Sequence, residues 1–422
     1  MKALSEMTVT DPGIAQDPYE YYARLRSEDP VHWDEQLGAW LVTRYDDIVA
    51  TARNTVVFSD EMRVSDKVRS PYQDEANAYI ESKGFYLLDP SDSFKVDGDL
   101  HKRRRKLVSH AFTAHAVAAM ADRVAELCRE QMATFADGGE VDLLKSYAVP
   151  VPLNVICDAL GLPLDRTAEV SRAAYSMVAR AGAGANREEA FQHADNVMQL
   201  QQFAREAIEE RRKEHRGDLI SQVVHSGADL PPEEQLTEKE LISIVSVSIA
   251  GGVDTTRNTI AYALYTLATR PELFKRLQES ENQEKDIAAF CEETLRFYTP
   301  VPALPRVATE DTEIGGKAIA RDSLVFLCWA SGNRDPERFE NPDVFDIDRT
   351  TSAQHLAFGT GVHLCLGAML ARNEVKAAIR QFVNSVESVE LAVAEDDLDY
   401  SESLVILRGL KSLPVRLKMK AA

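Results

Sequence analysis

The sequence predicts a mainly helical α+β fold with a small β-rich region at its edge. Four segments have the length and apolar periodicity of long helices, whereas the strand signals are short and flanked by turn residues. No Gly/Ser/Pro-rich linker divides the 422 residues, and no repeat of fixed period occurs. We therefore expect a single domain over residues 1–422, long enough to bury a large core.

The first sixty residues predict a helix after Asp17-Pro18, strands at 31–33 and 39–43, and a helix from Tyr45. The long helices are expected at 114–135, 187–215, 237–269 and 283–298. The third of these ends at Arg270-Pro271, because the residue before a proline disfavours helix. Short strands with turns at Gly315-Gly316 and Arg321-Asp322, an irregular segment over 333–349, a helix after Gly367 and a closing hairpin over 403–418 complete the expected order.

Composition excludes several classes of protein. The chain has 48 basic and 68 acidic residues, a net charge of −20, so its surface repels phosphates and nucleic acid is not an expected partner. The N-terminus shows no secretion signal, and the apolar run Leu241–Val253 is shorter than the roughly 20 residues of a membrane span. We expect a cytoplasmic protein without a membrane partner. Five cysteines without CxxC spacing predict neither a disulfide framework nor a Cys-rich zinc site.

One glycine-rich segment carries a candidate reactive group. The chain has no GxGxxG, GxxxxGK[ST], GxSxG or HExxH, but residues 358–367 have the sequence FGTGVHLCLG. A lone cysteine is usually a small buried hydrophobe. Cys365, however, directly precedes a predicted helix, whose N-terminus would lower the thiol pKa. The surrounding glycines would let a flat, bulky group approach the backbone closely, which favours a ligand role for the sulfur. A nucleophilic cysteine would instead need a nearby His with Asn or Asp, and of these only His363 is evident.

This segment resembles the haem-binding loop of the cytochrome P450 family, FxxGx[HR]xCxG, at every fixed position: Phe358, Gly361, His363, Cys365 and Gly367. The resemblance implies the P450 fold and a cofactor, haem b (iron protoporphyrin IX). It also implies that Cys365 is the axial thiolate ligand of the iron and that His363 meets a haem propionate.

A second segment, AGGVDTT at residues 250–256, lies in the middle of the helix expected at 237–269. Two adjacent glycines cost about 2 kcal/mol of helix propensity, and a planar group lying against the helix would explain them. Thr255 follows Gly251 by one turn, so its hydroxyl can bond the Gly251 carbonyl and locally open the helix. The segment resembles the family's motif [AG]Gx[DE]T, which implies that Gly251 faces the cofactor and that Asp254 and Thr255 deliver protons for oxygen activation.

Two further motifs fit the family in kind and in order. Glu293 and Arg296 form an ExxR before a PERF-type element at 336–339, which in the family is a buried structural pair behind the haem loop. His101 and Arg105, at i and i+4 on one helix face, resemble the family's propionate-binding HxxxR, and Arg306 matches a third propionate-binding position. The segment before His101, Asp97-Gly98-Asp99-Leu100, departs from the common DPPEH.

The neighbouring basic residues Lys102, Arg103, Arg104 and Lys106 are either a solvated helix face or a docking patch for an acidic iron–sulfur protein. By resemblance, a separate ferredoxin and an NAD(P)H-dependent ferredoxin reductase supply the electrons.

The resemblance implies a monooxygenase that inserts one oxygen atom of O2 into a hydrophobic small molecule. A peroxide-driven or oxidative-coupling haem-thiolate enzyme and a non-catalytic haem-binding sensor or carrier are the alternatives; the Asp254-Thr255 pair favours O2. By analogy with the family, the predicted substrate pocket includes the segments 85–94, 181–185 and 405–406. Its individually predicted residues are Ile249, Ala250, Val253, Val301, Leu304 and Ile406.

Overall fold

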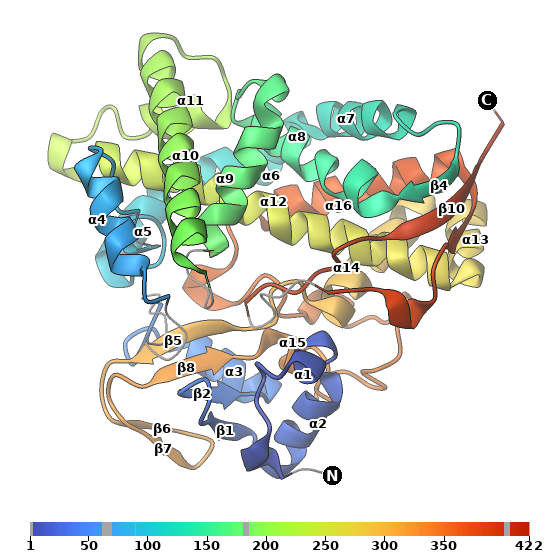
Figure 1. Ribbon diagram of the computed structural model, residues 1–422, viewed down its shortest axis with the longest axis horizontal. Coiled ribbons are helices and arrows are strands. Elements are labelled where there is room, and N and C mark those ends of the chain that lie inside the picture. Colours follow the sequence, from blue (N-terminus) through green and yellow to red (C-terminus); the bar gives the residue numbers. More distant parts are fainter. Residues whose placement is uncertain (1–2, 61–69, 89, 180–184, 401–405, 422) are drawn as a thin grey trace.

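The computed structural model describes residues 3–60, 70–88, 90–179, 185–400 and 406–421. Long helices make up one side of the molecule, and a small sheet with short helices makes up the other (Figure 1). None of the helices in these ranges is long and apolar enough to cross a membrane. The α-helices are α1 Pro12–Gln16, α2 Tyr19–Glu28, α3 Tyr45–Arg53, α4 Gln73–Ser82, α5 Gly98–Val108, α6 Ala114–Ala119, α7 Ala121–Ala133, α8 Pro150–Ala159, α9 Thr167–Ala179, α10 Arg187–Lys213, α11 Leu219–His225, α12 Glu238–Thr269, α13 Pro271–Glu279, α14 Gln283–Tyr298, α15 Trp329–Gly332 and α16 Ala368–Ser385.

The strands form three sheets. A five-stranded sheet has the order β1-β2-β8-β5-β3, with β2 and β8 parallel and the other neighbours antiparallel. A three-stranded antiparallel sheet has the order β4-β10-β9, and β6 and β7 form a hairpin. The strands are β1 Val31–Asp34, β2 Ala39–Val42, β3 Phe58–Ser59, β4 Gly139–Asp142, β5 Leu304–Ala308, β6 Thr312–Ile314, β7 Lys317–Ile319, β8 Leu324–Leu327, β9 Val386–Leu391 and β10 Pro414–Met419.

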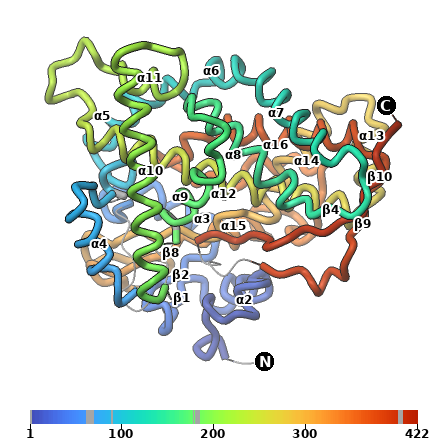
Figure 2. Tube along the Cα trace, turned by 45° about the horizontal axis from the view of Figure 1, so that its top comes forward, coloured from blue at the N-terminus to red at the C-terminus, as the bar shows by residue number. Residues whose placement is uncertain are grey.

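Helix α12 runs through the centre of the helical side, where it packs against α8, α9, α10, α14 and α16 (Figure 2). A capping box starts it: Thr237 Oγ1 accepts a hydrogen bond from the Glu240 N–H, and Glu240 Oε2 accepts one from the Thr237 N–H. The helix ends before Pro271, as predicted. Apolar clusters on both sides of α12 form the two largest parts of the core, so the helix is buried along most of its length.

Most predicted elements are confirmed, with two corrections. The helix predicted over 114–135 is divided into α6 and α7 at Met120, whose side chain packs against both large apolar clusters. The turn lets each short helix bury its own apolar face. The hairpin predicted over 403–418 is wrong within the described residues, because β10 pairs with β4 and β9 instead of with the segment just before it. Residues 403–405 lie outside the described residues.

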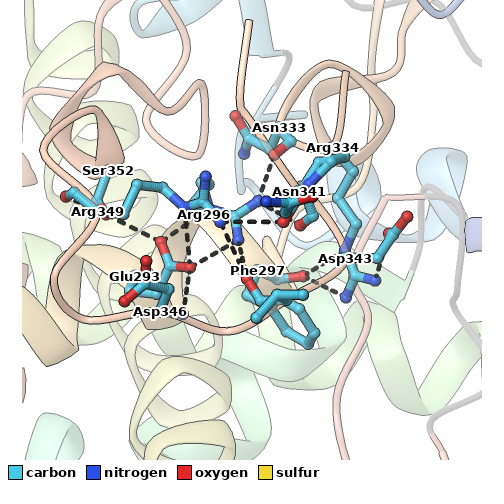
Figure 3. Close-up of polar contacts among 12 residues, drawn as sticks. Glu293, Arg296, Phe297, Asn333, Arg334, Asn341, Asp343, Asp346, Arg349 and Ser352 are labelled. Atoms are coloured by element: carbon cyan, nitrogen blue, oxygen red, sulfur yellow. Dashed lines mark hydrogen bonds and ion pairs between the residues drawn. The ribbon is translucent and has the colours of Figure 1, made fainter. Parts of the chain in front are cut away.

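A buried ion pair within α14 also contacts the irregular segment that precedes the Cys365 loop (Figure 3). Arg296 Nε and Nη2 lie 2.8 and 2.7 Å from the two oxygens of Glu293, and both side chains are fully buried. The guanidinium also donates to the carbonyl oxygens of Asn333 and Pro342. These contacts fix the segment on α14.

The Glu293 carboxylate receives further donors from the same segment. The Asp346 backbone N–H, the Arg349 guanidinium and the Ser352 hydroxyl all lie within hydrogen-bond or ion-pair distance of it. Burial acts to raise the pKa of Glu293, but Arg296 and these donors outweigh it and hold the pKa below its ordinary value. Arg349 and Ser352 are part of this network although the sequence did not single them out.

The preceding residue, Glu292, makes a second network at the Cys365 loop. Its carboxylate lies 2.6 Å from Arg372 Nε on α16 and 3.3 Å from His355 Nε2. Arg372 also stacks over the Phe358 ring, 4.5 Å from its centroid. Burial acts to raise the pKa of Glu292, but His355 and Arg372 outweigh burial and lower the pKa to about 2.

We predict that Glu293→Ala lowers the free energy of unfolding by about 3–5 kcal/mol, because it leaves the Arg296 charge buried without its partner. Denaturant unfolding of the full chain measures this loss. Asp348→Ala is the matched control, since it breaks an exposed pair with Arg276 and should cost at most about 1 kcal/mol. Equal losses in the two variants would contradict a structural role for the buried pair.

We predict that Glu292 stabilises the fold above its ordinary pKa of 4.5, and that this contribution is lost as the pH falls from 4.5 toward 2. A carboxyl with a depressed folded-state pKa binds its proton more readily in the unfolded chain, so acid favours unfolding. The loss is on the order of 3 kcal/mol. Glu292→Gln should flatten the fall of stability over this pH range, measured by circular dichroism. Glu279→Gln, at an exposed pair on α13, should leave the wild-type slope unchanged.

Candidate functional site

A cavity of about 370 Å³ lies between α12 and the glycine-rich loop at 358–367. Helix α5, strand β5, the first turns of α16 and residues of several other elements and loops contribute further parts of its wall, so the site draws on distant segments of the chain. Its lining is mostly apolar, and Cys365, Thr255 and a group of basic side chains are the main exceptions. The predicted residues in the lining are His101, Arg105, Gly251, Thr255, Val301, Leu304, Arg306, Phe358, His363, Cys365 and Gly367.

Cys365 stands on one wall of this cavity, just before α16. Of the five cysteines it alone is exposed, because its side chain opens on the cavity. Its backbone N–H donates to the Phe358 carbonyl at 2.9 Å, which closes the loop into a compact turn. Gly361 has φ of +73°, and a Cβ there would lie 3.4 Å from Arg53 Cγ. Only glycine fits this tight, left-handed position comfortably.

The predicted lowering of the Cys365 pKa is wrong as a net effect. Burial is the largest influence and raises the pKa of the thiol. The Gly367 backbone amide, Arg105, Arg372 and Lys95 act in the opposite direction without overcoming burial. The donors expected at a helix start are therefore present, but the surrounding protein atoms raise the thiol pKa by more than these donors lower it.

The facing wall is the middle of α12. Gly251 is exposed within this buried helix, and a Cβ added to it would have no atom within 4 Å. Thr255 donates its hydroxyl hydrogen bond to the Gly251 carbonyl at 2.7 Å, as predicted. Helix α12 nevertheless remains an uninterrupted α-helix, so the predicted local opening is not observed. Asp254 is buried and does not line the cavity.

Four predicted basic residues meet at the edge of the cavity. His101 and Arg105 come from α5, Arg306 from β5 and His363 from the Cys365 loop. The rings of His101 and His363 lie 4.3 Å apart. Burial, together with the nearby His363 and Arg105, lowers the pKa of His101 to about 4. Basic side chains from three separate elements therefore lie together at this edge of the cavity.

Two carboxylates that sequence reasoning did not select stand against this cluster. Asp60 pairs with Arg306 and Lys95 and lies 3.3 Å from His363 Nδ1, while Asp97 lies 2.9 Å from His363 Nε2. Asp97 belongs to the segment where the chain departs from the DPPEH pattern, which was a usable signal. No local sequence pattern indicated that Asp60 would lie in this cluster.

Several buried polar atoms in the cavity wall have no hydrogen-bond partner among the described residues. They include His101 Nε2, Arg306 Nε and Glu374 Oε2. Glu374 lies on α16, and burial raises its pKa well above the ordinary value. Sequence reasoning missed it, because a glutamate within a helix carries no local sign of burial.

The predicted substrate residues divide into two groups. Val301 and Leu304 line the cavity. Ile249, Ala250 and Val253 do not line it, because they are buried in the apolar cluster that joins α12 to α8 and α10. The face of α12 that lines the cavity consists of Val247, Ser248, Gly251, Gly252, Thr255, Thr256 and Thr259. Ile406 is half-buried and is not part of the lining, and residues 181–184 and Val405 lie outside the described residues.

The basic run on α5 is also less exposed than predicted. Arg104 is buried and pairs with Glu240, and Arg103 pairs with the same carboxylate and donates to the Gln235 carbonyl. These two arginines hold α5 against the start of α12. Lys102 and Lys106 are exposed, and Lys102 pairs with the exposed Asp99.

Comparisons with known proteins agree with this geometry. Residues 183–407, more than half of the chain, match the family model described as "Cytochrome P450". The chain is 32% identical to 6-deoxyerythronolide B hydroxylase of Saccharopolyspora erythraea over 95% of this chain and 96% of that protein. It is also 32% identical to vitamin D(3) 25-hydroxylase of Pseudonocardia autotrophica over 96% of this chain and 95% of that protein.

A solved structure supports the same relationship. Cytochrome P450 CYP109Q5 from Chondromyces apiculatus superposes with a TM-score of 0.83 at 28% identity, with each chain covered over its full length. From the family model, these relatives and the shared fold, we conclude that the chain belongs to the cytochrome P450 family and is a P450 monooxygenase, a class of enzyme that carries haem.

Proposed function

We propose that the protein is a haem-thiolate monooxygenase that inserts one oxygen atom from O2 into a hydrophobic small molecule. The cofactor is haem b, and residues 1–422 act as one P450 domain in the cytoplasm. One observation supports this function above all others: Cys365 opens on a mostly apolar cavity whose opposite wall carries Thr255 beside an exposed helix glycine. A cavity with a sulfur ligand on one side and a proton donor on the other suits oxygen activation.

The residues around the cavity fit haem. His101 Nε2 and Arg306 Nε are buried donors without partners, which two propionates would satisfy. The open space at Gly251 suits a flat ring, and Phe358 lines the same cavity. We propose that Cys365 ligates the iron, that His101, Arg105, Arg306 and His363 bind the propionates, and that Phe358, Gly361 and Gly367 shape the loop.

Bound haem would supply the reductive activation of O2, which the thiolate assists by donating electron density. The chain's own residues control which molecules enter the cavity and how protons reach it. The Thr255 hydroxyl is held by the Gly251 carbonyl on the cavity wall, where it can pass a proton into the cavity. The adjacent Asp254 carboxyl can then return a proton to the Thr255 hydroxyl. Val247, Val301 and Leu304 exclude water and orient an apolar substrate.

The relatives' names do not rank the substrates, since one specifies 6-deoxyerythronolide B and the other vitamin D(3). Among the lining residues, no side chain on the α12 face of the cavity is charged, which supports an uncharged, hydrophobic substrate. A screen of terpenoid, steroid, fatty acyl and polyketide compounds for substrate-induced spin-state shifts tests this directly.

We propose a ferredoxin with an NAD(P)H-dependent reductase as the electron source. Val362 and Met369, beside Cys365, are exposed apolar residues, and Lys102 and Lys106 are exposed cations on the neighbouring α5. An apolar centre with cations nearby suits an acidic redox protein.

We predict that Cys365→Ser abolishes oxygenation and the thiolate signature of the ferrous carbon monoxide spectrum, because a hydroxyl cannot replace the thiolate as ligand. Absorption spectroscopy of the reduced, CO-treated protein measures this. Cys157→Ala, which removes a buried thiol away from the cavity, should retain the spectrum. An unchanged spectrum in Cys365→Ser would exclude this sulfur as the ligand.

We predict that Thr255→Ala keeps the cofactor and substrate-binding spectra but lowers product formed per NADH by about tenfold or more, with peroxide formed instead. The cause is the loss of the hydroxyl that delivers protons into the cavity. Thr269→Ala removes the same kind of hydroxyl-to-carbonyl hydrogen bond at the end of α12, outside the cavity. This variant should form as much product per NADH as wild type. Undiminished coupling in Thr255→Ala would remove this residue from proton delivery.

A further inference from the structure

The lining of the cavity contains three cations and two acidic residues, among the residues that the structure describes. The cations are Lys95, Arg105 and Arg306, and the acidic residues are Asp60 and Glu374. Burial raises the pKa of Glu374 well above its ordinary value, so this carboxyl is neutral at neutral pH. Asp60, which is paired with cations, therefore supplies the negative charge of the acidic side chains in this lining.

The pairing of β3 with β5 places Asp60 beside Arg306. The two strands are antiparallel with Ser59 opposite Val307, so the next residue along the chain, Asp60, comes opposite Arg306. The two side chains form an ion pair, and both residues are only 2% exposed. Asp97 Oδ2 accepts hydrogen bonds from the Asp60 N–H at 2.9 Å and from the Ser59 hydroxyl at 2.6 Å. These bonds fix the backbone from which the Asp60 side chain projects.

Asp60 also contacts basic side chains from two other segments. Its Oδ2 lies 3.2 Å from Lys95 Nζ and 3.3 Å from His363 Nδ1. The three basic partners come from the segment before α5, from β5 and from the Cys365 loop. A carboxylate accepts hydrogen bonds at both oxygens, so one buried side chain can hold all three partners. Asp60 therefore joins three distant parts of the chain at the edge of the cavity.

The charge of Asp60 acts beyond its own ion pairs. Burial is the largest influence on Arg306 and His101, and it lowers the pKa of each. In both cases Asp60 is the carboxylate that acts most strongly in the opposite direction, followed by Asp97. Solvent screens a buried charge only weakly. The same charge would therefore act on a redox centre bound in the cavity that Asp60 lines.

We propose that Asp60 is a positioning residue that lowers the reduction potential of the bound haem. A negative charge beside a redox centre favours the oxidised form, because that form carries one more positive charge than the reduced form. Asp60 thereby sets how readily an electron donor passes one electron to the oxidised haem, while it holds Arg306, Lys95 and His363 in place. This inference rests on the proposed haem-thiolate function.

The test measures the reduction potential of the haem in substrate-free wild-type holoenzyme and in four variants. Asp60→Asn removes the charge but keeps the shape of the side chain, and Asp60→Glu keeps the charge. Lys95→Gln removes a cation that pairs with Asp60. Asp99→Asn is the matched control, since it removes an acid whose side chain is 98% exposed in the first turn of α5.

Spectroelectrochemical titration with mediator dyes gives the potential of each protein. Thermal unfolding reports folding, and the rate of haem loss to excess apomyoglobin reports retention of the cofactor.

We expect Asp60→Asn to raise the potential, so that the ratio of reduced to oxidised haem at the wild-type midpoint rises about tenfold, or about 59 mV for one electron. The shift should persist at high salt, because the charge is buried. Asp60→Glu should lie closer to wild type than to Asp60→Asn. Lys95→Gln should lower the potential, because it leaves Asp60 with one cation fewer. Asp99→Asn should match wild type, since solvent screens its charge.

A wild-type potential in haem-loaded Asp60→Asn would overturn the inference, even if its stability or haem retention fell. A shift of the same size and sign in Asp60→Glu would also overturn it, because packing and not charge would then set the potential. If Asp60→Asn does not retain haem, an unchanged or raised potential in Lys95→Gln would overturn it instead. Failure of the proposed function is a different result: wild-type holoenzyme would then lack the thiolate spectrum or form no product from O2 with its electron donors, whatever the potentials of the variants.

Discussion

The position of Cys365 depends on ion pairs that hold an irregular segment to α14. The chain between α15 and α16 has little regular structure, so backbone ladders do not fix it in place. Glu293 and Arg296 fix the first part of this segment, and Glu292 contacts His355 near its end as well as Arg372 on α16. Two adjacent residues of one helix thereby set where the thiol lies relative to α12. Their burial makes these pairs costly to break, which suits a ligand that must stay in place.

Features encoded by local contacts were predictable from the sequence. The start of α12 follows from the Thr237 and Glu240 side chains, and its end follows from Pro271, because caps and prolines act within one turn. The Thr255 hydroxyl bond and the His101–Arg105 pair follow from helical spacing in the same way. In each case the residues that decide the structure are neighbours in sequence.

Features that depend on distant partners were not predictable. The alternation of apolar and polar residues in β10 identifies a strand but not the strands that pair with it, which are β4 and β9. On α12 serine and threonine side chains occur both on the cavity face and away from it, so they did not show that Val247, and not Ile249, faces the cavity. Arg104 looked like a surface residue because its partner Glu240 lies at the start of another helix. Asp60 likewise meets Arg306 only through the pairing of β3 with β5.

The two faces of α12 separate the conflicting demands of the site. Burial strengthens electrostatic interactions, but it also raises the pKa values of Cys365 and Asp254. An α-helix turns about 100° per residue, so consecutive residues point in different directions. Thr255 can therefore face the cavity while Asp254 pairs with Arg257 away from it. One continuous helix thus places two adjacent residues in different surroundings, one on the cavity wall and one beside a half-buried cation.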